Sequence, residues 1–196
     1  LRRSNRRGYR IMPDTLVGTG VVPHTAEVNA TGEVLVRADS NPSTYFDSLR
    51  EQRTFNAVMP SFSASNGEYV LYVKNTHPTL LLHIESIEYH SVEAVHWKVW
   101  HVTGTAAGAT IIIPSLLNLN GNRIADATVM GGAAAITGLT TVTQIGTHRT
   151  TALSEAGMNF GDALFLGNSQ AIAVEYDTGT TGLCEIDCIF SYVERV

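Results

Sequence analysis

The chain has 196 residues, a length that one domain can fill, and large β-sandwiches and barrels often reach it undivided. Charged residues make up only 16% of the sequence, below the roughly 25% of ordinary soluble domains, and hydrophobic residues make up 44%. This balance argues against a well-solvated monomer and favours a surface that a partner partly covers, although a domain rich in Thr, Gly and Ala would show the same balance. Because no apolar run reaches about 18 residues and no signal-peptide pattern opens the chain, we expect neither a membrane span nor export by that route.

The first ten residues form a basic arm. They contain five arginines and no acid, which leaves eight basic and eighteen acidic residues, a net charge of −10, for the rest of the chain. The five are Arg2, Arg3, Arg6, Arg7 and Arg10. Such an arm attracts an acidic partner: nucleic acid, an acidic protein surface or the acidic body of a neighbouring copy. Since no recognition element follows the arginines, we expect an assembly arm, with nucleic acid and a solvated tail as the less favoured alternatives.

Residues 1–40 as a whole are predicted to be an extended basic arm and loop, because Pro and Gly interrupt them repeatedly. Only residues 33–38 indicate a short strand there. Residues 41–196 are predicted to form a single domain. Its one expected helix covers residues 43–55, where Ser43 or Thr44 can cap the first turn and Asp47 lies within it.

From Phe55 onward, short segments rich in Val, Ile, Thr and aromatic residues alternate with Gly, Asn and Pro turn signals, which is typical of strands. We expect a loop with at most one short strand over residues 121–138, and a bulge or sheet edge at Pro114. The expected strands are residues 68–75, 80–90, 93–102, 111–119, 139–148, 163–166, 171–177 and 183–193. This pattern predicts an all-β protein, a β-sandwich whose usual large form is the jelly roll.

The two cysteines, Cys184 and Cys188, lie four residues apart in one expected strand. At ~3.3 Å per residue they stand about 13 Å apart, whereas a disulfide needs Cα atoms within ~7 Å of each other. We therefore expect two buried free thiols, as in a protein made in a reducing cytoplasm.

Potential metal ligands are densest between residues 77 and 101. The group consists of His77, His83, Glu85, Glu88, His90, Glu93, His96 and His101. A cupin-like metal site needs a His-x-His pair followed by a glutamate, and His83-x-Glu85 is the nearest approach to one. Strand parity also separates His83 and Glu85 from Glu88 and His90. We expect no metal and no other cofactor, and we interpret the histidines as groups at sheet surfaces or subunit contacts that could respond to pH near 6.

Catalytic patterns are missing from the sequence. It has no Gly-x-Ser-x-Gly elbow, and Cys188 lies in mid-strand, where a thiol is normally inert. Residues 18–20 and 104–108 are glycine-rich but lack the Lys-Ser/Thr ending of a phosphate-binding loop. Pairs of carboxylates for glycoside hydrolysis could be drawn from many acids, and the sequence ranks none of them. We expect a protein that is not an enzyme.

Trp97 and Trp100 are three residues apart in one expected strand, so their side chains should point to opposite faces. We expect one of them in the core. The other could lie at an interface or line a sugar-binding surface.

Residues 111–193 contain a series of turn-and-strand patterns: Asn118-Leu-Asn-Gly-Asn122, Ala125-Asp-Ala-Thr128, Gly138-Leu-Thr-Thr, the run from Gly161 to Tyr176, and Gly179-Thr-Thr-Gly182 before an aromatic strand. In these patterns the chain resembles virion proteins of tailed bacteriophages, especially jelly-roll head decoration or cement proteins. The resemblance implies an oligomer, commonly a trimer, that is assembled in the host cytoplasm and binds the major capsid protein on the outside of the head. The alternative is a carbohydrate- or receptor-binding module of a phage tail or fibre, with Trp97 or Trp100 as its platform.

Overall fold

The computed structural model describes residues 27–28, 34–35, 53–117, 121–132, 134–161 and 163–194. The chain divides into one unit up to Asn41 and a second from Pro42 onward. In the first unit, β1 (Glu27–Val28) pairs antiparallel with β2 (Val34–Leu35), and β2 lies within the short strand expected over residues 33–38. The five arginines of the basic arm lie outside the described residues.

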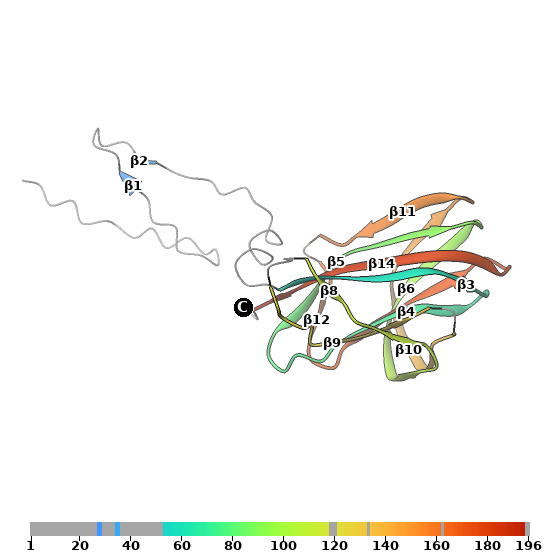
Figure 1. Cartoon of the computed structure of the whole chain (residues 1–196), viewed down its shortest axis with the longest axis horizontal. Coiled ribbons are helices and arrows are strands. Elements are labelled where there is room, and N and C mark those ends of the chain that lie inside the picture. Colours follow the sequence, from blue (N-terminus) through green and yellow to red (C-terminus); the bar gives the residue numbers. More distant parts are fainter. Residues whose placement is uncertain are drawn as a thin grey trace, which may run out of the picture. The chain divides into compact units, whose positions relative to one another are not determined.

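The described part of the second unit consists of two packed antiparallel sheets (Figure 1). The first, here called the β14 sheet, has the order β11-β5-β14-β3-β8, and β12 also pairs with β5. Its strands are β3 (Thr54–Ala64), β5 (Leu81–Ser91), β8 (Ser115–Leu116), β11 (Ser154–Asn159), β12 (Phe165–Leu166) and β14 (Gly182–Val193).

The second sheet, here called the β13 sheet, has the order β10-β6-β13-β4-β9-β7. Its strands are β4 (Glu68–Asn75), β6 (Val95–Ala107), β7 (Thr110–Ile112), β9 (Ala127–Gly131), β10 (Thr137–Thr150) and β13 (Ala171–Asp177). Among the described residues there is no helix, and therefore none long and apolar enough to cross a membrane.

The longer strands pair in a nested order. β3 pairs with β14 and β4 with β13, while β5 lies between β14 and β11 and β6 lies between β13 and β10. Early strands thus pair with late ones across the whole unit, which is the double Greek-key wrapping of a jelly roll. The predicted fold class, an all-β sandwich of jelly-roll form, is confirmed.

The core lies between the two sheets and is rich in aromatic rings. Trp97, fully buried on β6, stacks on Tyr89 of β5 with ring centroids 4.7 Å apart and meets Tyr176 of β13 edge-on at 5.4 Å. Phe55 of β3 stacks on Phe190 of β14 at 5.7 Å. The Trp97–Tyr89 contact joins the two sheets, whereas the other two contacts join neighbouring strands within one sheet.

In the second unit, several expected strands are confirmed and two were missed. β4 and β13 have the bounds predicted for them, and the strand expected over residues 111–119 is divided at Pro114 into β7 and β8, which belong to different sheets. β3 and β11 were not predicted. Of the helix expected over residues 43–55, residues 43–52 lie outside the described residues, and its end is wrong, because Thr54 and Phe55 are buried in β3.

The outer sides of the two sheets differ. On the outer side of the β13 sheet, a second hydrophobic cluster buries Tyr72, Met130 and Ile136, and the Ile136 N–H donates to the Tyr69 carbonyl at 3.3 Å. On the outer side of the β14 sheet, by contrast, Val58 and Leu183 each remain about half exposed, at 52% and 51%. Apolar side chains therefore remain uncovered on the outer face of the β14 sheet.

Candidate functional site

The predicted His and Glu group is dispersed over the fold. His77 Nδ1 accepts the Leu80 N–H at 2.9 Å, and buried His83 bonds to the Gly161 carbonyl and stacks on Phe165 at 4.7 Å. His96 contacts the Thr147 hydroxyl on the opposite sheet from His83. Within the described part of the chain, no three His, Cys, Asp or Glu side chains are grouped closely enough to hold a metal ion.

The two tryptophans lie on opposite faces of β6, as their spacing predicts. Trp97 is fully buried, and its indole N–H donates to the Thr150 hydroxyl at 3.1 Å. Trp100 is partly exposed on the outer side of the β13 sheet, and its N–H donates to Glu175 Oε2 at 2.7 Å. Of this pair, only Trp100 can take part in a surface.

A compact ion-pair network surrounds Trp100. Lys98 Nζ lies 2.7 Å from Asp177 Oδ2 and 3.4 Å from Glu175 Oε1. The hydrogen bond to Lys98 lowers the pKa of Asp177, and the hydrogen bond to Asp177 raises the pKa of Lys98. Lys98 and Trp100 therefore give the two carboxylates on this outer face partners within the chain.

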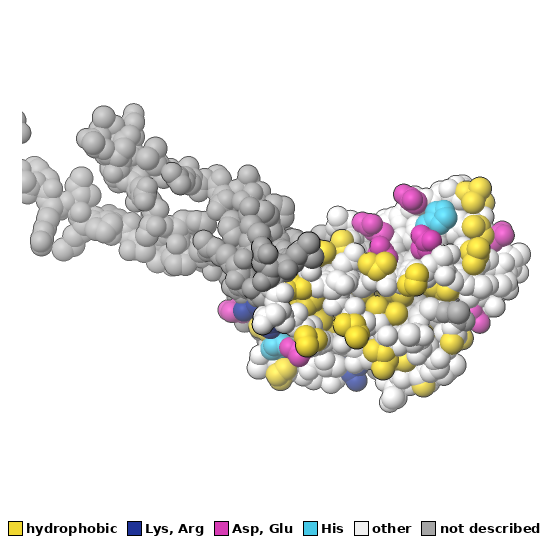
Figure 2. Space-filling model, in the orientation of Figure 1, with side chains coloured by type: hydrophobic (Ala, Val, Ile, Leu, Met, Phe, Trp, Pro, Cys, Tyr) yellow, Lys and Arg dark blue, Asp and Glu magenta, His cyan; other side chains and the backbone are white. Residues whose placement is uncertain are grey.

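The outer face of the β14 sheet carries a different arrangement, here called the acidic face. His90 on β5 lies between Glu155 of β11 and Glu185 of β14, and in the neighbouring row Glu88 of β5 lies directly opposite Asp187 of β14. Figure 2 shows acidic side chains gathered around a histidine over β11 and β5, with no Lys or Arg among them. Neighbouring strands are about 4.8 Å apart, so these carboxylates lie close enough to repel one another.

The repulsion is visible in one of these carboxylates. Burial is the main cause that raises the pKa of Asp187, and the negative charges of Glu88 and Glu185 raise it further, against a hydrogen bond from the Met59 backbone. A positive charge beside Asp187 would therefore relieve part of the repulsion on the acidic face.

The acidic face was only partly visible in the sequence. Alternation along β14 places Glu185 and Asp187 on the side away from the core, and alternation along β5 places Glu88 and His90 together on one side of that strand. The sheet order and the strand register bring the two pairs of side chains together on one face. They also add Glu155 from β11, a strand that was not predicted. No local sequence signal carries that information.

An apolar segment closes one side of the sandwich. Residues 110–117, here called the edge segment, run from β7 at the edge of the β13 sheet to β8 at the edge of the β14 sheet. They contain no charged residue, and Ile111, Ile113 and Leu117 expose 69%, 81% and 43% of their surface. Exposed apolar strips of this kind mark interaction surfaces.

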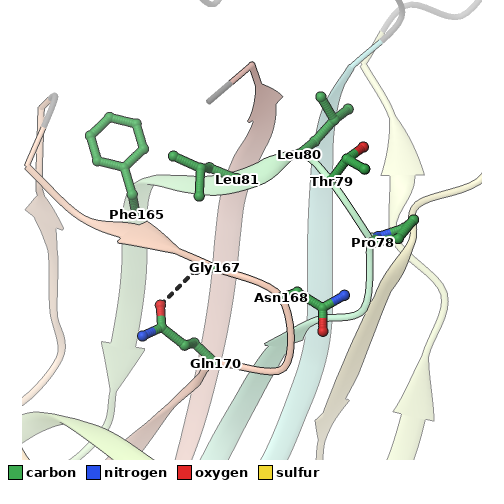
Figure 3. Close-up of a pocket in the computed structure, with 8 residues that line it drawn as sticks. All are labelled: Pro78, Thr79, Leu80, Leu81, Phe165, Gly167, Asn168 and Gln170. Atoms are coloured by element: carbon green, nitrogen blue, oxygen red, sulfur yellow. Dashed lines mark hydrogen bonds between the residues drawn. The ribbon is translucent and has the colours of Figure 1, made fainter. Parts of the chain in front are cut away.

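A cavity of about 410 Å³ opens beside β12 (Figure 3). The Phe165 ring, Leu81 and Leu80 lie along one side of it, and Asn168 and Gln170 lie along the other (Figure 3). The Gly167 N–H donates to Gln170 Oε1 at 2.7 Å. None of the eight lining residues carries a titratable side chain, so they provide apolar, hydroxyl and amide contacts.

The cysteines are as predicted. Cys184 and Cys188 are free and buried on the inner face of β14. Burial raises the pKa of Cys184 to about 12 and raises that of Cys188 as well. A buried thiol with a raised pKa is a poor nucleophile.

Comparisons with protein-family models, with curated proteins and with solved structures found no match to this chain.

Proposed function

We propose that this chain is a non-enzymatic structural subunit that assembles with copies of itself on a virion, as a decoration or cement subunit of a tailed-phage head. The observation that carries the self-assembly is the edge segment, where Ile111 and Ile113 are more than two-thirds exposed without a charged neighbour in residues 110–117. Covering such side chains contributes about 25 cal/mol per Å² of apolar surface, so burial against another copy is favourable. The phage setting rests on the resemblance in residues 111–193 and on the jelly-roll fold, which occurs in viral capsid proteins and also in lectins.

The first test is the size of the particle in solution. We expect a trimer, or failing that a dimer, in sedimentation velocity at micromolar concentration, and a 21.2 kDa monomer would contradict the proposal. Ile113→Lys places a charge in the edge segment and should weaken the association. Leu153→Lys is the matched control, because Leu153 is 74% exposed in the turn between β10 and β11 and outside the edge segment.

The second test concerns the particle. The chain should co-sediment with expanded tailed-phage capsids, and Ile113→Lys should lower its occupancy if attachment requires the oligomer. An oligomer that never binds such capsids would leave self-assembly standing and would refute the decoration role.

The alternative, a carbohydrate- or receptor-binding module of a tail or fibre, has Trp100 as its platform. Its ring is partly exposed beside Lys98 and Glu175. Because these polar groups bind one another, fewer of them remain for a sugar, and we favour assembly. Binding on a glycan array that Trp100→Ala abolishes would favour the alternative.

A further inference from the structure

We propose that the acidic face of the β14 sheet is the docking surface for the arginine-rich arm, residues 1–10, of a neighbouring copy. The inference rests on the proposed self-assembly and names the contact that adds to it. It follows from the charges of the two sheets, from the register of the strands and from the composition of the arm.

Positive and negative side chains are unequally divided between the two sheets. The strands of the β14 sheet carry five acids and no Lys or Arg over their whole described length. The acids are Glu85, Glu88, Glu155, Glu185 and Asp187. The β13 sheet carries Lys74, Lys98 and Arg149, and Lys98 pairs with the two acids nearest to it. The cations that would balance the β14 sheet must therefore come from outside it.

The register of β11, β5 and β14 brings the acids of the acidic face into two neighbouring rows. Glu155, His90 and Glu185 form one row across three strands, and Glu88 and Asp187 form the next. Like charges directly opposite each other in a sheet are unfavourable, so the isolated face stores repulsion that a cation between the rows would relieve. Arginine suits this role, because its planar guanidinium can bond two carboxylate oxygens at once.

The acidic face also offers apolar surface. Val58 lies opposite Asp187 on β3, and Leu183 lies two residues before Glu185 on β14, and both are about half exposed. Arginine side chains pack their aliphatic stems on such surface while the guanidinium reaches a carboxylate. A segment with five arginines in ten residues and no acid therefore complements the face in both charge and apolar area.

The chain is long enough for the arm to contact a neighbouring copy. Residues 11–52 separate the arm from β3, and 42 residues span at most ~140 Å when extended. A link of this length lets the arm reach a neighbouring copy as well as its own body. A copy held at the edge segment brings a second acidic face within reach, so docking between copies adds to the assembly that the edge segment begins.

The decisive experiment is complementation between two full-length variants. One has all five arm arginines changed to Gln, and the other is Glu88→Gln/Glu185→Gln. In sedimentation velocity at low salt, each variant alone should associate about two- to thirty-fold more weakly than the intact chain, as expected for losing two partly screened ion pairs. An equimolar mixture should recover part of the loss, because the arm of one variant can dock on the intact face of the other. No recovery in the mixture would overturn docking between copies.

Matched controls separate this proposal from general charge effects. Asp126→Asn/Glu194→Gln removes the same charge from exposed acids outside the acidic face, and it should leave association unchanged. High salt should erase the difference between the intact chain and the Glu88→Gln/Glu185→Gln variant. A control that weakens association as strongly as the face variant would refute the inference.

Two further outcomes are distinguishable. If the intact chain and all of these charge variants associate equally while Ile113→Lys dissociates them, the arm docking is wrong and the proposed self-assembly stands. If the intact chain is a monomer at every salt concentration, the self-assembly itself is wrong. A duplex DNA oligonucleotide that binds the full chain through the arm arginines, with no effect of Glu88→Gln/Glu185→Gln on association, would assign the arm to nucleic acid and overturn the inference.

Discussion

Trp97→Phe should destabilise the sandwich far more than Trp100→Phe, although both change the same strand in the same way. Trp97 is fully buried between Tyr89 and Tyr176 and donates to Thr150, so it connects both sheets of the sandwich. Trp100 lies on the outer side of β6, where water can partly replace what the indole loses. The two variants therefore compare how much stability a tryptophan contributes on the buried face and on the outer face of β6.

The expected cost at Trp97 has three parts. Losing the five-membered ring leaves a space of about 40 Å³, which costs about 1 kcal/mol at 24 cal/mol per Å³. The lost burial of about 40 Å² of ring surface costs about another 1 kcal/mol. Thr150 as a residue is only 7% exposed, so removing the donor leaves its hydroxyl without that partner and costs about 1 kcal/mol more. We expect about 3 kcal/mol for Trp97→Phe and less than about 1 kcal/mol for Trp100→Phe.

Chemical denaturation measures both free energies of unfolding, and a domain of this size should lose roughly 2–4 °C of melting temperature per kcal/mol. Thr150→Val isolates the hydrogen bond: added to Trp97→Phe, it should cost less than it does alone, because the donor is already gone. Equal losses for the two tryptophan variants, or a larger loss at Trp100, would refute the assignment of Trp97 to the core.

Three further results are expected. Cys184 and Cys188 are buried free thiols with a raised pKa, so reductant should leave the melting temperature unchanged and the native protein should be alkylated slowly at pH 8. A loss of several degrees in reductant would reveal a disulfide between chains. Asp187→Asn should stabilise the protein at pH 7, because a carboxyl whose folded-state pKa is raised costs stability when it is ionised. The gain in stability should shrink as the pH falls through the raised pKa toward 3.8, and a loss of stability at pH 7 would contradict the prediction. Deleting residues 1–10 should leave the circular dichroism of the β-sandwich intact and weaken attachment to capsids at low salt, and an unfolded truncated chain would show that the arm belongs to the fold.

The elements that the sequence predicted best are those that local patterns delimit. β4 follows the Asn66-Gly67 turn and is apolar on both faces, so its bounds could be read directly. β3 was missed because Pro60 interrupts its pattern, and the register with β14 shifts between Met59 and Phe62 to accommodate an irregularity there. β11 was missed because its residues, Ser-Glu-Ala-Gly-Met-Asn, are poor strand formers that pair only because β5 offers them an edge.

The same limit explains why the acidic face was not predicted as a unit. Parity along one strand tells which side chains share a face, and this was enough to separate Cys184 and Cys188 from Glu185 and Asp187. It does not tell which strands are neighbours, and in a jelly roll the neighbours come from distant parts of the chain: β14 meets β5 about a hundred residues earlier. The sequence therefore revealed the excess of acid in the body and the excess of arginine in the arm, but the register alone brings the acids together on one open face. If the arm docks on the acidic face of a neighbouring copy, both salt and the concentration of the chain control assembly, because salt screens the ion pairs and concentration sets how often copies meet.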